Sequence, residues 1–401
     1  MHVDIAIVGA GPAGLCFART LARTGLSILL IEQQSLDTLR EPPFDGREIA
    51  LTQRSIRILH EFGVWQRLGP ADISPLRSAR VLNGKSLHGL QVTPNREGED
   101  ALGYLVPNHR IRRAAYASIE HEPNVTLACD TGVEAVALGD DAARLRLSTG
   151  AEVSAKLVVA ADSRYSRVRR EAGIPADMHD FGKTMLVCRM ALERPHHDEA
   201  LEWFGHHQTL AALPLNNSEA SIVLTLPPND MQRVMAMDDN AFQMDMRRRF
   251  DGRFGEMQLT STRHAYPLIG VYARRFVAQR LALIGDAAVG MHPVTAHGFN
   301  LGLRSVEALG GLLAQAAANR SDIAAGDLLR RYQCMHRLAT WPLYAATAAI
   351  VAIYTNEAPA ARLARTTLLR ASQALPPVRR AIAHALAAGR PLAAALPRHR
   401  S

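Results

Sequence analysis

The chain has 401 residues, of which 48% are hydrophobic and 21% charged, a balance typical of a soluble globular protein with a sizeable core. Its four cysteines lie far apart and share no ligand spacing with histidine, which argues against a disulfide framework and against a zinc site. We therefore expect no metal, a reducing compartment, and either two or three domains or one interleaved unit.

The N-terminal sequence MHVDIAIVGAG has no basic segment before its apolar stretch. It predicts a strand rather than a signal peptide and indicates a cytoplasmic protein. The pattern predicts this strand over residues 3–8, a helix over residues 13–24 and a second strand over residues 27–31.

Three glycines in the pattern G-x-G-x-x-G separate that strand from the helix, namely Gly9, Gly11 and Gly14. In that order they allow a tight turn, close approach of a pyrophosphate to the backbone, and close packing of the helix on the strand. The helix N-terminus presents free N–H groups to phosphates. Glu32 ends the second strand, where its carboxylate can accept hydrogen bonds from a ribose, and we expect Ala13 and Gln33 in the same site. The motif alone does not distinguish NAD from FAD.

Further along the chain, three strand-like runs alternate with polar turns. They cover residues 184–192, 209–214 and 220–226. This alternation predicts an antiparallel sheet.

A second polar turn follows an apolar strand predicted over residues 281–284. The strand ends on Gly285 and Asp286, and a carboxylate at this position can hold a hydroxyl of a ribityl chain. A helix then begins near three residues, Gly298, Phe299 and Asn300. Its N-terminus favours negative charge, such as the anion that reduced flavin carries at N1 and C2=O. This second turn therefore favours FAD over NAD.

The net charge of +8 comes from the C-terminal region, because residues 358–401 contain eight arginines and no acidic residue. Three explanations stay open for it: nucleic acid, an anionic membrane surface, or a solvated helical face of an arginine-rich protein. Residues 338–356 carry no charge, but Pro342 and many alanines make them only mildly apolar, so we favour a buried helix over a membrane span. Residues 361–375 form an amphipathic, basic pattern of leucines and arginines. This pattern is typical of a helix that packs on the protein or of one that lies on a bilayer.

Five segments in order make the chain resemble the class A FAD-dependent aromatic monooxygenases, and within them the UbiH/UbiF/VisC ubiquinone-biosynthesis hydroxylases. They are GAGPAGL, DGREIALTQRS, YLVPNHRIRRA, VVAADSRYSRVRR, and the stretch from YPL to the Gly-Asp turn. The chain departs from the usual pattern at Ser163, Val289, Ser305 and residues 295–298. The altered loop at 295–298 is similar to that of the UbiM branch of the family.

The resemblance implies the α/β fold of para-hydroxybenzoate hydroxylase, with a Rossmann-type FAD domain interleaved with an antiparallel-sheet substrate domain. The expected boundaries are 1–75, 100–175 and 277–335 for the FAD domain, 76–99 and 176–276 for the substrate domain, and 336–401 for a helical basic C-terminal region.

The resemblance also assigns site residues outside the two glycine-rich turns. It implies FAD contacts for Arg47, Asn108 and Asp162. The catalytic candidates are His292, Pro293 and His297, and the substrate candidates are Tyr266 and His264. Each histidine could instead cap or pack a loop, and Tyr266 could equally be a core residue.

The implied chemistry is that NAD(P)H reduces FAD and that dioxygen forms a flavin C4a-hydroperoxide, which hydroxylates the aromatic ring of a polyprenylated phenol or quinol in ubiquinone biosynthesis. The implied partners are that lipid substrate and O2, with peripheral contact at the inner face of the membrane or a ubiquinone-biosynthesis complex, and no nucleic acid. Three alternatives stay open: a soluble small aromatic substrate, prenyl-chain reduction or halogenation, and a flavin-binding, lipid-presenting subunit without oxygenase activity.

Overall fold

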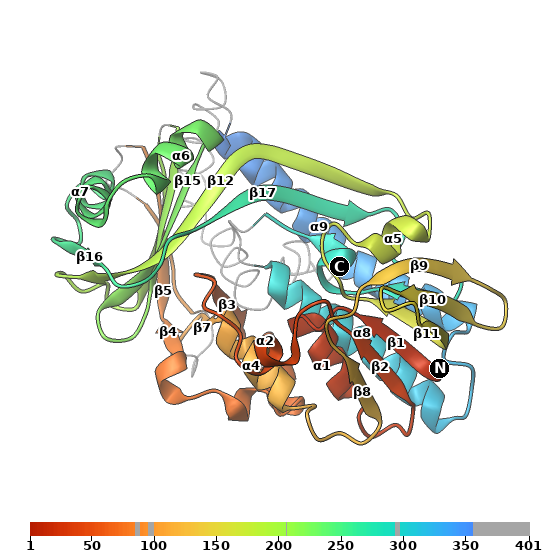
Figure 1. The fold of residues 1–401 in the computed structure, drawn as a ribbon. Coiled ribbons are helices and arrows are strands. Elements are labelled where there is room, and N and C mark those ends of the chain that lie inside the picture. The colour runs from red at the N-terminus through yellow and green to blue at the C-terminus, as the bar shows by residue number, and fades with distance from the viewer. Residues whose placement is uncertain (85–88, 95–99, 206, 293–296, 356–401) are drawn as a thin grey trace, which may run out of the picture.

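The computed structural model describes residues 1–84, 89–94, 100–205, 207–292 and 297–355. Within them, the chain forms a mainly parallel sheet, a nine-stranded mainly antiparallel sheet and a small three-stranded sheet. Figure 1 shows the two large sheets at opposite ends of the molecule, with β12 (Ala176–Leu192) and β17 (His264–Ala273) reaching from one to the other.

The parallel sheet has the strand order β18-β19-β11-β1-β2-β8, and β10 and β9 extend it from β11. Its strands are β1 (His2–Val8), β2 (Ile28–Ile31), β8 (Val125–Ala128), β9 (Val133–Leu138), β10 (Ala143–Leu147), β11 (Glu152–Ala160), β18 (Val277–Ala278) and β19 (Leu281–Leu283). The central strands are buried over most of their length because helices cover the sheet, and β2 is entirely apolar. Two of these helices, α1 (Pro12–Thr20) and α8 (Gly298–Ala318), pack against each other where Gly310 lies beside Thr20.

The nine-stranded sheet has the order β20-β17-β12-β15-β14-β13-β5-β6, with β16 paired to β12. The strands not yet named are β5 (Ser78–Asn83), β6 (Leu90–Val92), β13 (Glu199–Phe204), β14 (Thr209–Pro214), β15 (Glu219–Leu226), β16 (Met257–Leu259) and β20 (Val289–Gly290). Because side chains alternate along a strand, one face packs Leu186, Ile222 and Leu224 into a core with α6 (Pro228–Met235) and α7 (Asp239–Arg249). The opposite face is left to line a cavity.

The three-stranded sheet joins these two parts. It contains β3 (Glu48–Thr52), β7 (Gly103–Pro107) and β4 (Ser74–Leu76), and around it lie α2 (Leu36–Arg40), α3 (Gln53–Glu61), α4 (Asn108–Ala117) and the 3-10 turns η1 (Trp65–Arg67) and η2 (Pro70–Asp72). The side chain of Asn300 connects the start of α8 to β3 through two hydrogen bonds. Its Oδ1 accepts from the Thr52 N–H at 3.1 Å, and its Nδ2 donates to the Ala50 carbonyl at 2.8 Å.

The α/β fold class predicted from the sequence is confirmed, and two predicted boundaries differ by more than one residue. The first helix ends at Thr20 rather than at 24, because the chain turns over the next residues and Gly25 takes a positive φ of 74°. β12 begins eight residues earlier than predicted, since an irregularity around Gly182 (φ 60°) lets it continue along β17.

The uncharged segment near the C-terminus belongs to α9 (Gly326–Thr355), which contains Pro342 and buries one of its faces. Thr340 is fully buried, and its hydroxyl lies 3.0 Å from that of Tyr272. No helix within the described residues is long and apolar enough to cross a bilayer. The basic region predicted beyond α9 lies outside the described residues.

Candidate functional site

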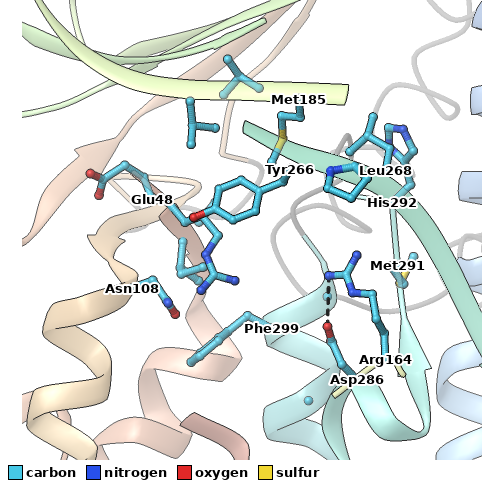
Figure 2. A pocket seen from close by; sticks show the side chains of 18 of the residues that line it. Glu48, Asn108, Arg164, Met185, Tyr266, Leu268, Asp286, Met291, His292 and Phe299 are labelled. Carbon is cyan, nitrogen blue, oxygen red and sulfur yellow. Dashed lines mark hydrogen bonds and ion pairs between the residues drawn. The ribbon is translucent and has the colours of Figure 1, made fainter. Parts of the chain in front are cut away.

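A cavity of about 760 Å³ lies between the turn after β1 and the free face of the nine-stranded sheet. At one end it is lined by Gly11, Glu32, Asp162 and the Gly285–Asp286 turn. The opposite wall is lined by cavity-facing residues of the sheet, among them Met185, Val187, Val223, Thr225 and Tyr266. Figure 2 shows Met185 and Tyr266 on this wall and Asp286 on the other side of the cavity. The cavity therefore joins a polar site for a nucleotide to a largely apolar compartment.

The glycines of the first turn occupy three different environments. Gly9 has a φ of 104°, and a Cβ there would lie 2.6 Å from the Ala161 carbonyl oxygen. A Cβ on Gly14 would lie 1.9 Å from the Gly9 carbonyl oxygen, so the helix packs directly on the turn. A Cβ on Gly11 would meet nothing within 4 Å, because Gly11 faces the cavity. This open backbone suits the close approach of a pyrophosphate.

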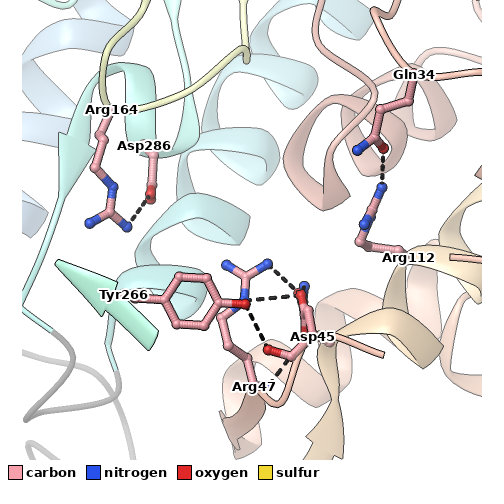
Figure 3. A network of polar contacts seen from close by, with 8 residues as sticks. Gln34, Asp45, Arg47, Arg112, Arg164, Tyr266 and Asp286 are labelled. Carbon is pink, nitrogen blue, oxygen red and sulfur yellow. Dashed lines mark hydrogen bonds and ion pairs between the residues drawn. The ribbon is translucent and has the colours of Figure 1, made fainter. Parts of the chain in front are cut away.

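The predicted acidic residue lies beside this turn. Glu32 Oε2 accepts from the Ala10 N–H at 2.6 Å, and Oε1 accepts from the Gln34 N–H at 2.9 Å. Ala13 lines the cavity, whereas Gln33 does not. The neighbouring Gln34 does line it and receives a hydrogen bond from Arg112, a pair visible in Figure 3. Sequence reasoning missed both of these residues.

Asp45 forms hydrogen bonds with three predicted site residues, Arg47, Asn108 and Tyr266 (Figure 3). Its Oδ2 accepts from Arg47 Nη2 at 2.6 Å and from Asn108 Nδ2 at 2.7 Å, and its backbone carbonyl accepts from the Tyr266 hydroxyl at 2.8 Å. Burial raises the pKa of Asp45, but Arg47 and Asn108 outweigh it and hold the pKa below its usual value. Three predicted site residues are thus brought together by one residue that was not predicted: Asp45 binds Arg47 and Asn108 through its carboxylate and Tyr266 through its backbone carbonyl.

The hydrogen bonds of the Asp162 carboxylate indicate whether a dinucleotide fits this end of the cavity. One carboxylate oxygen, Oδ2, accepts from the Arg167 N–H at 2.8 Å. The other, Oδ1, is buried and has no hydrogen-bond partner among the residues that the structure describes. Burial raises the pKa of this carboxyl despite hydrogen bonds from Ser166 and the backbone. A buried acceptor next to the open Gly11 backbone fits a hydroxyl or N–H donor of FAD.

The second turn contributes the far side of the nucleotide site. Gly285 has a φ of 58° and donates its N–H to Ser305 Oγ at 3.1 Å. Asp286 is half-exposed and pairs with Arg164 Nη2 at 3.2 Å, as Figures 2 and 3 both show. Gly298 and Phe299, at the start of α8, line the cavity. Asn300 does not line it, because its side chain is directed to β3.

The three histidines singled out in the sequence have different positions. His292 lines the cavity with its ring 4.6 Å from that of Phe181, and burial lowers its pKa to about 4, so it is neutral at pH 7. His297 is buried before α8 and does not line the cavity. His264 does not line it either, and its Nε2 lies 2.9 Å from Thr262 Oγ1. Pro293 lies outside the described residues.

Two further carboxyl groups line the cavity and were not predicted. Glu48 begins β3 and pairs with Arg189 of β12, and Glu202 lies on β13. Burial raises the pKa of Glu48 to about 7, against the opposing effect of Arg189, and raises that of Glu202 to about 8. The only sequence signal for these positions was a charged residue inside an apolar strand: Glu202 in EALEWF, and Arg189, the partner of Glu48, in MLVCRMAL.

Comparisons with known proteins agree with this geometry. The family model described as FAD binding domain matches residues 2–346. The ubiquinone hydroxylase UbiM of Neisseria meningitidis is 45% identical over 386 residues, which cover 95% of this chain and 84% of that protein. The ubiquinone hydroxylase UbiL of Rhodospirillum rubrum is 33% identical over 94% of this chain and 87% of its own length.

Among solved structures, p-nitrophenol 4-monooxygenase of Pseudomonas putida superposes with a TM-score of 0.76 at 18% identity, covering 96% of this chain and 98% of that chain. This similarity establishes a fold shared with FAD-dependent monooxygenases. The resemblance seen in the sequence is confirmed, and FAD is the cofactor that the nucleotide site accommodates. The chain therefore belongs to the FAD-binding family that includes these ubiquinone hydroxylases.

Proposed function

We propose that this protein is an FAD-dependent monooxygenase that hydroxylates the aromatic ring of a polyprenylated phenol or quinol in ubiquinone biosynthesis. The observation that carries the proposal is the 45% identity to a ubiquinone hydroxylase across 95% of the chain. The cavity supports it, because the nucleotide site opens directly onto the apolar wall of the sheet. NAD(P)H is the proposed reductant, and O2 supplies the oxygen atom.

When FAD is bound, it supplies the reaction with dioxygen that no protein side chain can perform. The chain's own residues then have two tasks. Gly11, Glu32, Asp162 and Asn108 hold the dinucleotide, Asn108 near its phosphates, while Arg47 and the start of α8 position its flavin end. The apolar side chains of the sheet exclude water and orient the ring, and His292 takes part only as a neutral hydrogen-bonding group at neutral pH.

A quinone profile tests this function. The chain is expressed in a bacterial strain that lacks its own ring hydroxylases, and the lipid extract is analysed by mass spectrometry. We expect ubiquinone to reappear, and the remaining intermediates to identify the ring carbons that are oxidised. An unchanged profile despite FAD-loaded protein would contradict the proposal and favour a soluble aromatic substrate or a lipid-presenting role without oxygenase activity.

We also infer that one face of α9 contacts the anionic membrane surface where a polyprenylated substrate resides. Three large apolar side chains are exposed along it, Met335, Leu338 and Trp341, and Leu338 is 75% exposed. Exposed arginines lie nearby, Arg331 on α9 and Arg274 after β17, whose carbonyl accepts a hydrogen bond from Arg337 of α9. An apolar strip flanked by cations is typical of a helix that lies in a bilayer interface.

The substitution Leu338→Glu should weaken binding to vesicles of mixed anionic and neutral phospholipid by about tenfold, because it removes an inserting side chain and adds repulsion from the lipid charge. Co-sedimentation of the FAD-loaded protein measures this. The matched control is Met244→Glu, which changes another exposed apolar residue on the distant helix α7 and should leave binding unchanged. Equal losses in both variants would show that net charge, and not α9, controls the binding.

A further inference from the structure

A buried carboxylate that the nucleotide site does not use lies in the substrate compartment. The side chain of Glu48 is fully buried and lines the cavity, next to Ile49 and Ala50 of the same strand. Its Oε1 accepts from Arg189 Nε at 2.8 Å and from Arg189 Nη2 at 2.6 Å. Its Oε2 is buried and has no hydrogen-bond partner among the described residues. One oxygen is therefore fixed by a guanidinium while the other remains available to a ligand.

The surroundings of the Glu48–Arg189 pair indicate the kind of ligand that this part of the cavity suits. Ser221 lies directly opposite Arg189 on β15, and its hydroxyl is also buried in the cavity wall, with no partner within the described part of the chain. The next cross-strand pair on the same face is Val187 with Val223, which is apolar. A flat apolar ring that carries a hydroxyl matches this combination, since the hydroxyl can donate to Glu48 and accept from Ser221.

Glu48 also lies near the flavin end of the cavity. It directly follows Arg47, and Ile49 and Ala50 line the cavity beside the start of α8, which Asn300 holds against β3. Figure 2 shows Glu48 and Asn108 on the same side of Tyr266. A ring whose hydroxyl reaches Glu48 is thus placed against the segment that positions the flavin.

We propose that Glu48 is the catalytic base of this enzyme, an inference that rests on the proposed ring hydroxylation. The O–H bond of the ring hydroxyl breaks, its proton moves to Glu48 Oε2, and the electron pair remains on the phenolate oxygen, which raises the electron density of the ring. Arg189 stays cationic throughout, so it compensates the carboxylate before the transfer and the phenolate after it. The net charge of the cavity does not change.

The charges around Glu48 support this role. The charged groups that act on Glu48 are Arg189, Asp45 and Glu219, and His109 interacts in turn with Arg189 and Asp45. Burial raises the pKa of Glu48 to about 7, Arg189 opposes this, and Asp45 and Glu219 add to it. The carboxylate form therefore predominates above pH 7, and a base with a pKa near the working pH is efficient in both directions of proton transfer.

The second carboxyl on the substrate side of the cavity, Glu202, does not fit the same role. Glu202 lies three strands away from β12 across the sheet, roughly 14 Å at the usual spacing of strands. No basic side chain pairs with it among the described residues, and burial raises its pKa to about 8, so it is mostly protonated at pH 7. A protonated carboxyl donates a hydrogen bond but cannot accept the proton of a phenol.

The test compares 2-allylphenol with its methyl ether, in which a methyl group replaces the ionisable hydrogen. Binding to the full-length, FAD-loaded protein is followed through the flavin absorbance between pH 6 and pH 9. We expect the wild type to prefer the phenol at least tenfold, with the preference increasing as pH rises through about 7. Glu48→Gln should lose both the preference and its pH dependence. The control Glu219→Gln removes a carboxylate that raises the pKa of Glu48 but does not line the cavity, and it should keep the preference and its pH dependence, with the midpoint moved to lower pH.

A second variant and a second readout separate the possible failures. If Glu48→Gln does not load FAD, Glu48→Asp retains a carboxylate on a shorter side chain and should show a weaker preference with the same dependence on pH. A full preference in Glu48→Gln, or no preference in the wild type, would overturn the inference. In turnover, Glu48→Gln should lower kcat about 100-fold for a prenylated phenol. If the wild type prefers the phenol but hydroxylates none, the proposed function fails and the assignment of Glu48 as the proton acceptor stands.

Discussion

Alanine at Gly11 and alanine at Gly14 should damage the protein in different ways, although both residues belong to the same glycine-rich turn. At Gly14 the new methyl group would lie 1.9 Å from the Gly9 carbonyl oxygen, a backbone atom that cannot move aside. We expect Gly14→Ala to lower the free energy of unfolding of the FAD-free protein by about 3 kcal/mol or more. At Gly11 the methyl group meets no protein atom, so the stability of the FAD-free protein should not change.

The substitution Gly11→Ala should weaken only the binding of FAD. The methyl group projects into the cavity, where it keeps a pyrophosphate away from the backbone N–H groups at the start of α1. We expect the Kd for FAD to rise on the order of 100-fold, about 2.7 kcal/mol. Denaturant unfolding without FAD and titration with FAD measure the two effects. Gly311→Ala, on an exposed part of α8, is the control and should not weaken FAD binding. Equal destabilisation by Gly11→Ala and Gly14→Ala would contradict this division of roles.

The nucleotide half of the site was predictable because its determinants are local in sequence. Strand, turn, helix and acidic residue follow one another within residues 2–32, and the bond from Ala10 to Glu32 closes the unit. The Gly285–Asp286 turn was predictable for the same reason, since an apolar strand leads directly into it. In both places a backbone requirement selects glycine, and that selection is visible in a single sequence.

The substrate half was not predictable in the same way, because its residues meet through sheet register. Glu48 and Arg189 are 141 positions apart, and they pair only because β3 lies against the cavity face of β12. Asn300 is a similar case. It stays a predicted cofactor contact, and its side chain accepts a hydrogen bond from the Thr52 N–H 248 positions away, a contact that no local pattern indicates. Neither His264 nor His297 lines the cavity. His264 lies beside Thr262 and His297 is buried before α8, and these positions depend on tertiary packing that the sequence pattern does not show.

The substitution Arg189→Met should destabilise the protein by an amount that grows with pH. Burial raises the pKa of Glu48 from 4.5 to about 7 even with the guanidinium present, so the folded protein holds this proton more tightly than the unfolded chain. Without Arg189 the pKa in the folded state rises further. Below pH 7 Glu48 is protonated in both proteins, and the variant loses only two hydrogen bonds, about 2 kcal/mol. Above pH 7 the wild type ionises Glu48 against Arg189, whereas the variant must keep the proton or bury an unpaired charge.

The difference in the free energy of unfolding between the variant and the wild type should change with pH at a defined rate. As long as only the variant retains the proton, its free energy of unfolding falls relative to the wild type by about 1.4 kcal/mol per pH unit. Urea unfolding at pH 7 and pH 8.5 should therefore show an additional loss of about 2 kcal/mol at the higher pH. Arg247→Met, which removes an exposed ion pair with Glu256, should show no such increase. In the double variant Glu48→Gln/Arg189→Met the pH dependence should disappear, because no ionisable group remains at the pair. A loss of stability that is the same at both pH values would mean that Glu48 does not titrate between them. The prediction that burial raises the pKa of this carboxyl would then be wrong.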